Sequence, residues 1–121
     1  MSDSFGLGKK GEEITADFLK KHGFIIFKQN YHSRFGEIDI IAEKGDLLLF
    51  VEVKTRFADN MVSPADAVDF RKRQRMRLTA KTFLNKTFID YKCRYDVSEV
   101  TVRIEDGEYK YSLNYIKNAF E

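Results

Sequence analysis

The stretch from Gly36 to Arg56 constrains the fold of this chain more than any other part of its sequence. Residues 37–42 alternate between Ile or Ala at even positions and Glu, Asp or Ile at odd ones. This is the period-2 pattern of a β-strand with two unlike faces. A break follows at residues 43–46, where Gly45 tolerates the positive φ of a tight turn. Residues 47–54 then form a second, strongly apolar run. The sequence therefore predicts a β-hairpin.

The position of the turn decides which side chains of this hairpin meet. If residues 44 and 45 form a two-residue turn, Asp39 lies opposite Phe50. In this register Asp39, Glu52 and Lys54 point to one face, near the same end of the hairpin. Because a shift by one residue would turn Asp39 to the other face, the prediction depends on the turn.

Carboxylates and an ammonium group at the end of a buried sheet need a physical explanation. Two like charges about 4 Å apart repel by about 4 kcal/mol at an effective dielectric of about 20, and a divalent cation removes that repulsion. A small number of oxygen ligands, with room left for water and phosphate, suits Mg²⁺ or Mn²⁺. Lys54 could then hold a water that attacks a phosphodiester. The alternative is an ordinary polar hairpin with a Glu–Lys ion pair, since Glu-x-Lys is a common pattern.

The composition is that of a single domain covering residues 1–121. The 121 residues are 43% hydrophobic and 33% charged, a balance that suits a soluble globular protein with one core. The longest apolar run, residues 47–51, is too short to cross a membrane, and no signal-peptide pattern begins the chain. A single cysteine, Cys93, excludes an internal disulfide framework. We therefore expect a cytoplasmic protein.

The other elements complete an α/β domain in which helices pack on a mixed β-sheet. The helix that follows the hairpin is the right length for a crossover to a parallel strand. Before the hairpin we expect a flexible entry at Gly6–Gly11, a helix at Gly11–His22 ended by Gly23, a strand at Phe24–Lys28 and a loop at Gln29–Phe35. After the hairpin we expect a flexible loop at Phe57–Val62 and a helix that runs from the N-cap Ser63 and Pro64 to about Leu84 or Lys86. The chain then continues with strands at Arg94–Glu105 and Tyr109–Ser112 and a closing helix at Leu113–Phe120.

Glu12 begins a row of the first helix that continues at Ala16 and Leu19 and otherwise faces the core. It can therefore point to the charged end of the hairpin as a further metal or water ligand. The alternative is that Glu12 complements the positive N-terminal end of its helix.

A basic stripe lies on the second helix, where five of the seven residues 71–77 are Lys or Arg. A phosphate-binding surface needs such a stripe, although a solvated helix face is the usual alternative. Lys72 lies on the same row as Met76 and can point towards the sheet. The candidate nucleic-acid-binding residues are Arg34, Arg56, Arg71, Lys72 and Arg75.

Ordered matches to one family pattern run along nearly the whole chain. They comprise Gly8, Gly11, Glu12 and Ala16, then Gly23 and Asn30, then GEIDII at Gly36–Ile41, FVEVKTR at Phe50–Arg56, Lys72 and Ala80, CRYDV at Cys93–Val97, and YIKNAF at Tyr115–Phe120. On these residues the chain resembles the bacterial YraN-like proteins, which are described as predicted endonucleases. That family is thought to be similar to archaeal Holliday junction resolvases and to restriction endonucleases of the PD-(D/E)xK superfamily.

The resemblance implies a restriction-endonuclease-like core with a metal site at the hairpin. Asp39 would anchor the metal, Glu52 would be the second ligand and the Val53 carbonyl a third. Lys54 would position the attacking water or stabilise the developing charge, and Glu12 matches a glutamate that resolvase-like enzymes hold near the metal. The residue before Asp39 is isoleucine where the broader nuclease pattern has proline, but the YraN-like proteins themselves read GEID there.

These observations lead us to expect a Mg²⁺- or Mn²⁺-dependent endonuclease acting on DNA, in particular on branched or junction structures. One alternative is a non-catalytic nucleic-acid-binding module on a nuclease fold, although intact Asp39, Glu52 and Lys54 argue against it. Another is a protein-interaction domain in which the charges are incidental. Because resolvase-like enzymes cut two strands symmetrically as dimers, a homodimer is also expected.

Overall fold

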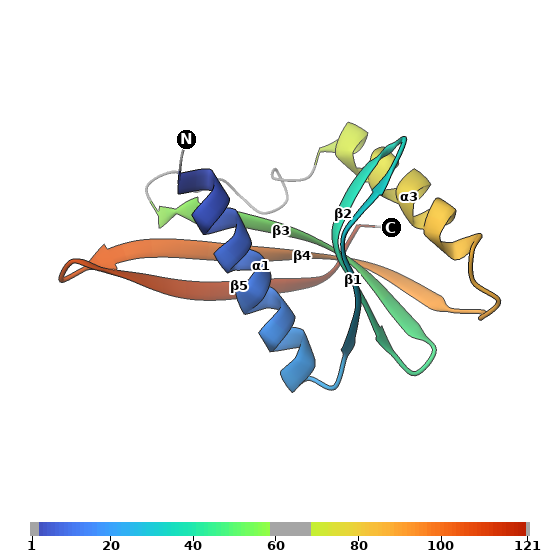
Figure 1. Cartoon of the computed structure of the whole chain (residues 1–121), viewed down its shortest axis with the longest axis horizontal. Coiled ribbons are helices and arrows are strands. Elements are labelled where there is room, and N and C mark those ends of the chain that lie inside the picture. Colours follow the sequence, from blue (N-terminus) through green and yellow to red (C-terminus); the bar gives the residue numbers. More distant parts are fainter. Residues whose placement is uncertain (1–2, 59–68, 121) are drawn as a thin grey trace.

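A computed structural model describes residues 3–58 and 69–120 of the chain. Its five strands form one sheet in the order β1-β2-β3-β4-β5 (Figure 1). Strands β3 and β4 are parallel and the other neighbours are antiparallel. The predicted mixed sheet with packed helices is therefore confirmed. The elements are α1 (Asp3–Lys21), β1 (Ile25–Ser33), β2 (Gly36–Lys44), β3 (Leu47–Phe57), α3 (Phe70–Leu84), β4 (Lys92–Glu105) and β5 (Glu108–Phe120).

The two described helices pack on opposite faces of the sheet because the central strand β3 is apolar on both faces. Leu49 and Val51 belong to a buried cluster with residues of α1, which crosses in front of the strands in Figure 1. Leu48 and Phe50 alternate with them and belong to a second cluster with residues of α3. A strand buried from both sides reads as a continuous apolar run, and this explains the composition of residues 47–51.

Helix α3 lies in the crossover between the parallel strands β3 and β4, as the sequence predicts. The proposed N-cap Ser63 and the following Pro64 fall outside the described residues. Within the described part, Asp69 has an extended backbone and caps α3, accepting a hydrogen bond from the Lys72 N–H at 2.9 Å. A single helix running from residue 63 to residue 84 is therefore wrong, because the extended Asp69 interrupts it.

The closing helix predicted at Leu113–Phe120 is wrong, because these residues belong to β5 and pair with β4. Leu113, Ile116 and Phe120 have helical spacing, but apolar and aromatic residues also alternate at positions 109, 111, 113 and 115. Pairing with β4 decides between the two periods, because β5 forms hydrogen bonds with the backbone of β4, which would otherwise be an edge strand of the sheet.

Two predictions at the N-terminal end are also wrong. Residues 6–11 are helical and belong to α1, where a flexible entry was expected. A Cβ at Gly11 would lie 1.9 Å from the Thr55 Oγ1 atom, so glycine allows α1 to approach β3 closely. The expected loop at residues 29–35 is mostly strand, since β1 continues to Ser33 and only residues 34 and 35 form the turn.

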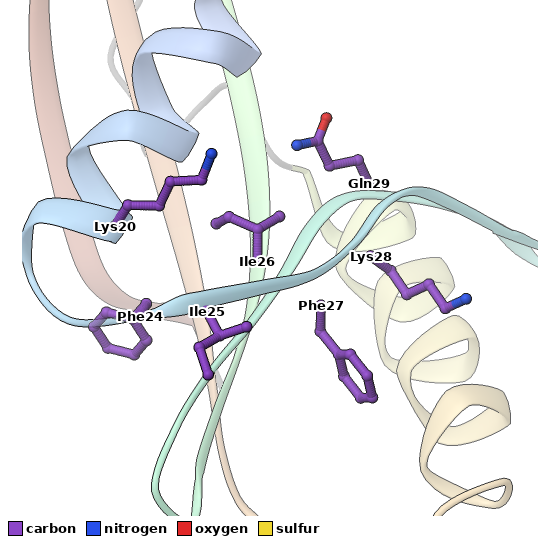
Figure 2. Close-up of a pocket in the computed structure, with 7 residues that line it drawn as sticks. All are labelled: Lys20, Phe24, Ile25, Ile26, Phe27, Lys28 and Gln29. Atoms are coloured by element: carbon purple, nitrogen blue, oxygen red, sulfur yellow. The ribbon is translucent and has the colours of Figure 1, made fainter.

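Strand β1 forms one edge of the sheet beside the C-terminal end of α1. An open hollow of about 570 Å³ lies there, lined by Lys20 and residues 24–29. Figure 2 shows Ile26 on the same side of β1 as Lys20, with Ile25 and Phe27 on the other side. None of the residues proposed for the metal site lines this hollow. No helix in the described ranges is both long enough and apolar enough to cross a membrane.

Candidate functional site

The β2–β3 hairpin turns at residues 45 and 46, one residue later than predicted. Ile41, and not Asp39, therefore pairs with Phe50, so the predicted register is wrong by two residues. Because a shift by two leaves every side chain on its face, the predicted charged end of the hairpin is kept. The pairing ends one residue short of Asp39 and Glu52, which are neighbours at that end.

Asp39 is a largely buried carboxylate at the point where the two strands stop pairing. Its Oδ2 atom accepts a hydrogen bond from the Val53 N–H at 2.8 Å, so a side chain satisfies a backbone donor of β3. Burial and the negative charge of Glu52 raise the pKa of Asp39 to about 8, and the hydrogen bond from Val53 opposes them only in part. Asp39 and Glu52 therefore repel one another strongly when both are ionised.

Glu52 is almost completely buried and lies between two ammonium groups. Its Oε2 atom is 2.9 Å from the Lys72 Nζ of α3 and 3.3 Å from the Lys54 Nζ of its own strand. Burial tends to lower the pKa of Lys72, but the hydrogen bond to Glu52 and the negative charges of Glu52, Asp39 and Glu37 together outweigh burial, so the pKa is raised. The two lysines thus compensate the buried charge of Glu52 in this structure.

Glu12 enters the same region from α1. Its Oε1 atom accepts a hydrogen bond from the Asn30 Nδ2 at 3.3 Å. Asn30 has a positive φ of 52°, a conformation that asparagine tolerates, and its position in β1 lies opposite Asp39. Burial raises the pKa of Glu12, and the charges of Glu37 and Glu52 add to that rise. Helix α1 therefore brings a third carboxylate into the electric field of the pair.

The structure brings together five of the residues that the sequence singles out, and these come from four elements. They are Glu12 of α1, Asp39 of β2, Glu52 and Lys54 of β3, and Lys72 of α3. No continuous sequence motif contains all of them, so the crossover and the packing of α1 assemble the site.

The other candidate phosphate contacts lie around this cluster rather than in it. Arg71 and Arg75 are exposed on α3, and Arg75 packs beside Gly36 at the start of β2. Arg34 is exposed in the β1–β2 turn, with its guanidinium 4.9 Å from the centre of the Phe35 ring. Arg56 is half-buried at the far end of β3.

Two further arginines of the basic stripe have a packing role. The guanidinium groups of Arg73 and Arg77 each lie 5.5 Å from the centre of the Phe120 ring. They therefore help to hold the end of β5 against α3 through cation–π contacts.

Sequence reasoning missed Glu99, a fully buried glutamate of β4. The parallel register places it beside Lys54, and neither of its carboxylate oxygens has a hydrogen-bond partner among the described residues. Burial raises the pKa of Glu99, while the nearby positive charges of Arg56 and Lys54 oppose the rise. One signal was available, because a single acidic residue in the run from Val97 to Val102 is unusual in a buried strand.

The acidic pair has the donor chemistry of a magnesium site. Among the described residues no three His, Cys, Asp or Glu side chains already converge on one point. Mg²⁺, however, keeps several waters and is commonly bound by one or two carboxylates. Burial is the main cause of the raised pKa of Asp39, and the charge of Glu52 adds a repulsion that such a cation would relieve. The carboxylates of Asp39 and Glu52 therefore have the chemistry to hold a divalent cation.

Comparison with known proteins gives a family whose activity is not described. A family model described as "Uncharacterised protein family UPF0102" matches residues 11–100. A UPF0102 protein of Clostridium perfringens is 41% identical over 115 residues, covering 94% of this chain and 93% of the relative. A relative in Alkaliphilus metalliredigens is 42% identical over 118 residues, covering 97% and 99%. Another, in Dictyoglomus thermophilum, is 44% identical over 108 residues, covering 85% and 92%.

Proposed function

The chain belongs to the uncharacterised protein family UPF0102, and we propose that it is a divalent-metal-dependent endonuclease that hydrolyses phosphodiester bonds in DNA. The observation that carries the proposal is the buried Asp39–Glu52 pair, with Lys54 and Lys72 beside it, at the end of the central hairpin. The proposal includes a restriction-endonuclease-like core, related to that of Holliday junction resolvases. It is supported by the mixed sheet with a helix on each face and by the order of the motifs along the chain.

The chemistry follows from the charges of these side chains. A bound Mg²⁺ or Mn²⁺ would supply a Lewis acid that lowers the pKa of water and offsets charge on the phosphate. Asp39 and Glu52 would hold the cation through their carboxylate oxygens, together with the Val53 carbonyl. Lys54 holds the attacking water or stabilises the negative charge that develops on the phosphate. Glu12, at the border of the pair, holds a further water.

The DNA backbone would be held by basic residues around the acidic pair. Arg71 and Arg75 of α3 and Arg34 of the β1–β2 turn are exposed and carry no acidic partner in an ion pair among the described residues. Contacts of such residues with phosphates release counterions, so binding should weaken steeply as salt concentration rises. Branched or junction DNA is the substrate we favour, and a homodimer would present two such sites for symmetric cutting.

One observation favours a second function, that of a non-catalytic nucleic-acid-binding module. Lys54 and Lys72 both lie on Glu52, so a cation must compete with two ammonium groups for that carboxylate. If Lys54 and Lys72 bind Glu52 more strongly than the cation does, the protein binds nucleic acid through its basic residues without cleaving it. Titration with Mg²⁺ followed by NMR discriminates the two functions, because a module would show no shifts at Asp39 and Glu52.

A cleavage assay tests the proposal directly. Labelled linear duplex, single strand, flap and four-way junction are incubated with the protein and Mg²⁺ or Mn²⁺. Asp39→Asn and Lys54→Ala run beside the wild type, and Asp46→Asn, an exposed carboxylate in the turn of the same hairpin, is the matched control.

We expect cleavage by the wild type and by Asp46→Asn, and its loss in the other two variants. Cleavage that survives both substitutions would come from a contaminant. No cleavage of any substrate, with salt-dependent binding retained, would favour the binding module. No cleavage and no binding would exclude both functions.

A further inference from the structure

Glu99 is the most unusual acidic residue outside the proposed metal site. Its side chain is completely buried, and neither carboxylate oxygen accepts a hydrogen bond from any described residue. Buried polar groups are nearly always hydrogen-bonded, because a carboxylate taken from water without a partner is costly. The unbonded Glu99 carboxylate should therefore destabilise the metal-free protein, which suggests a second state of the protein in which Glu99 accepts a hydrogen bond.

Two basic side chains of β3 are the partners that Glu99 could take. In the parallel register Lys54 is the residue beside Glu99, and Arg56 follows two residues later on the same face of β3. The positive charges of both residues act on the pKa of Glu99. Because both oxygens of Glu99 lack a partner, neither cation is hydrogen-bonded to this carboxylate. The Arg56 Nε is also buried without a hydrogen-bond partner.

Lys54 instead bonds to the carboxylate on its own strand. Its Nζ lies 3.3 Å from Glu52, and its side chain is 26% exposed. Lys54 therefore lies between two buried carboxylates, bonded to Glu52 and facing Glu99 across the strand pair. A cation bound at Glu52 would repel the ammonium group, and Glu99 is an unbonded buried carboxylate on the neighbouring strand that can accept it.

We propose that Glu99 is a positioning residue that receives the ammonium group of Lys54 when a divalent cation binds Glu52. The inference rests on the proposed function, because it supposes a cation at the acidic pair. Lys54 then remains beside the reacting phosphate on a fixed partner, whereas without Glu99 it would turn to solvent.

NMR of the lysine ammonium groups tests this transfer without depending on cleavage. The ¹⁵N signals of Lys54 and Lys72 are assigned with Lys→Arg variants and followed as Mg²⁺ alone is added to the wild type and to Glu99→Gln. Glu105→Gln, an exposed glutamate later on the same strand, is the control.

We expect the Lys54 signal to shift on Mg²⁺ binding and to remain sharp in the wild type and in Glu105→Gln. In Glu99→Gln it should broaden beyond detection, since the freed ammonium group exchanges quickly with water. A Lys54 signal that responds identically in Glu99→Gln and the wild type, while Asp39 and Glu52 shift, would overturn the role of Glu99 alone. Absence of any shift at Asp39 and Glu52 would overturn the proposed metal site and this inference with it.

A second pair of measurements separates positioning from a structural role. Without metal, Glu99→Gln and Glu99→Met should melt at the same temperature as the wild type or a higher one, because no hydrogen bond is lost. With DNA and Mg²⁺, kcat of Glu99→Gln should fall by about 100-fold with little change in KM, as expected for a misplaced catalytic group. Lower melting temperatures in both variants would show that Glu99 is structural and would overturn the proposal.

Discussion

Asp96 is a fully buried carboxylate and Asp39 a half-buried carboxylate of the same sheet, and their surroundings differ in one decisive respect. Asp96 accepts hydrogen bonds from the Arg94 Nε at 2.9 Å, the Arg94 Nη2 at 3.0 Å, the Tyr115 hydroxyl at 2.6 Å and the Asn118 N–H at 2.9 Å. Asp39 accepts one from the Val53 N–H and lies beside a second carboxylate.

This difference separates a carboxylate whose charge the fold compensates from one whose charge it leaves partly uncompensated. The protein itself supplies the complete set of donors for Asp96, so its charge holds β4 and β5 in register. The donors around Asp39 are incomplete, so the folded protein keeps an electrostatic repulsion that a ligand could remove. A buried carboxylate with missing donors is therefore the better indicator of a binding site.

The largest effect we predict is the loss of stability on replacing Asp96. Asp96→Ala leaves the guanidinium of Arg94 and the hydroxyl of Tyr115 without their buried partner, which should cost about 3–5 kcal/mol of unfolding free energy. Urea unfolding measures it, and Mg²⁺ should not change the loss. Asp46→Ala, at an exposed aspartate, is the control, with an expected change within about 0.5 kcal/mol. A loss as small as that of the control would remove the basis of the comparison.

Asp39→Asn should stabilise the folded protein, whereas Asp96→Ala should destabilise it. The amide keeps an oxygen for the Val53 N–H and removes the charge that repels Glu52, so the melting temperature without metal should rise. Mg²⁺ should then stabilise the wild type but not the variant. Differential scanning calorimetry with and without Mg²⁺ measures both effects. Equal shifts of the two proteins on adding Mg²⁺ would mean that the cation binds elsewhere.

The difference in unfolding free energy between Asp39→Asn and the wild type should depend on pH. The pKa of Asp39 is about 8 in the folded protein and about 3.9 when unfolded, so the folded state binds more protons between these values. The stability contributed by protonated Asp39 is fully present below about pH 4 and is lost as pH rises through about 8. The two proteins should therefore be nearly equal in stability at pH 4 and differ most at pH 8. A difference that is constant over this range, measured by urea unfolding at each pH, would contradict the shifted pKa.

The smallest predicted effects concern α1, which contacts both regions. It carries Glu12 to the acidic pair, and its Phe18 ring lies 5.0 Å from the ring of Tyr115, a partner of Asp96. Gly11→Ala would place a Cβ 1.9 Å from Thr55, so we expect a loss of about 1–3 kcal/mol and a displaced helix.

Gly8→Ala is the matched control in the same helix, because nothing lies within 4 Å of its added Cβ. It should gain about 0.5–1 kcal/mol from helix propensity alone. Thermal unfolding measures both variants. Similar stabilities for the two would mean that α1 does not approach β3 as closely as the structure has it.

The hairpin shows how far sequence reasoning reaches here. Alternation located β2 and β3 and put Asp39, Glu52 and Lys54 on one face, and an error of two residues in the register left that face unchanged. The same reasoning failed at residues 113–120, where two periods fit and only pairing with β4 selects the strand. It also missed Glu99, because a buried charge breaks the pattern on which strand assignment relies.

The sequence by itself located five strands, the two described helices and the residues available for chemistry, because these follow from local periodicity and residue type, although it assigned residues 113–120 of β5 to a helix. Only the tertiary structure decided which charges meet. Glu52 pairs with Lys72, and Glu99 faces Lys54, through the crossover of α3 and the parallel register of β3 and β4. Such contacts join residues 20 to 45 positions apart, and their energies depend on burial and on missing hydrogen-bond donors, which no local pattern records.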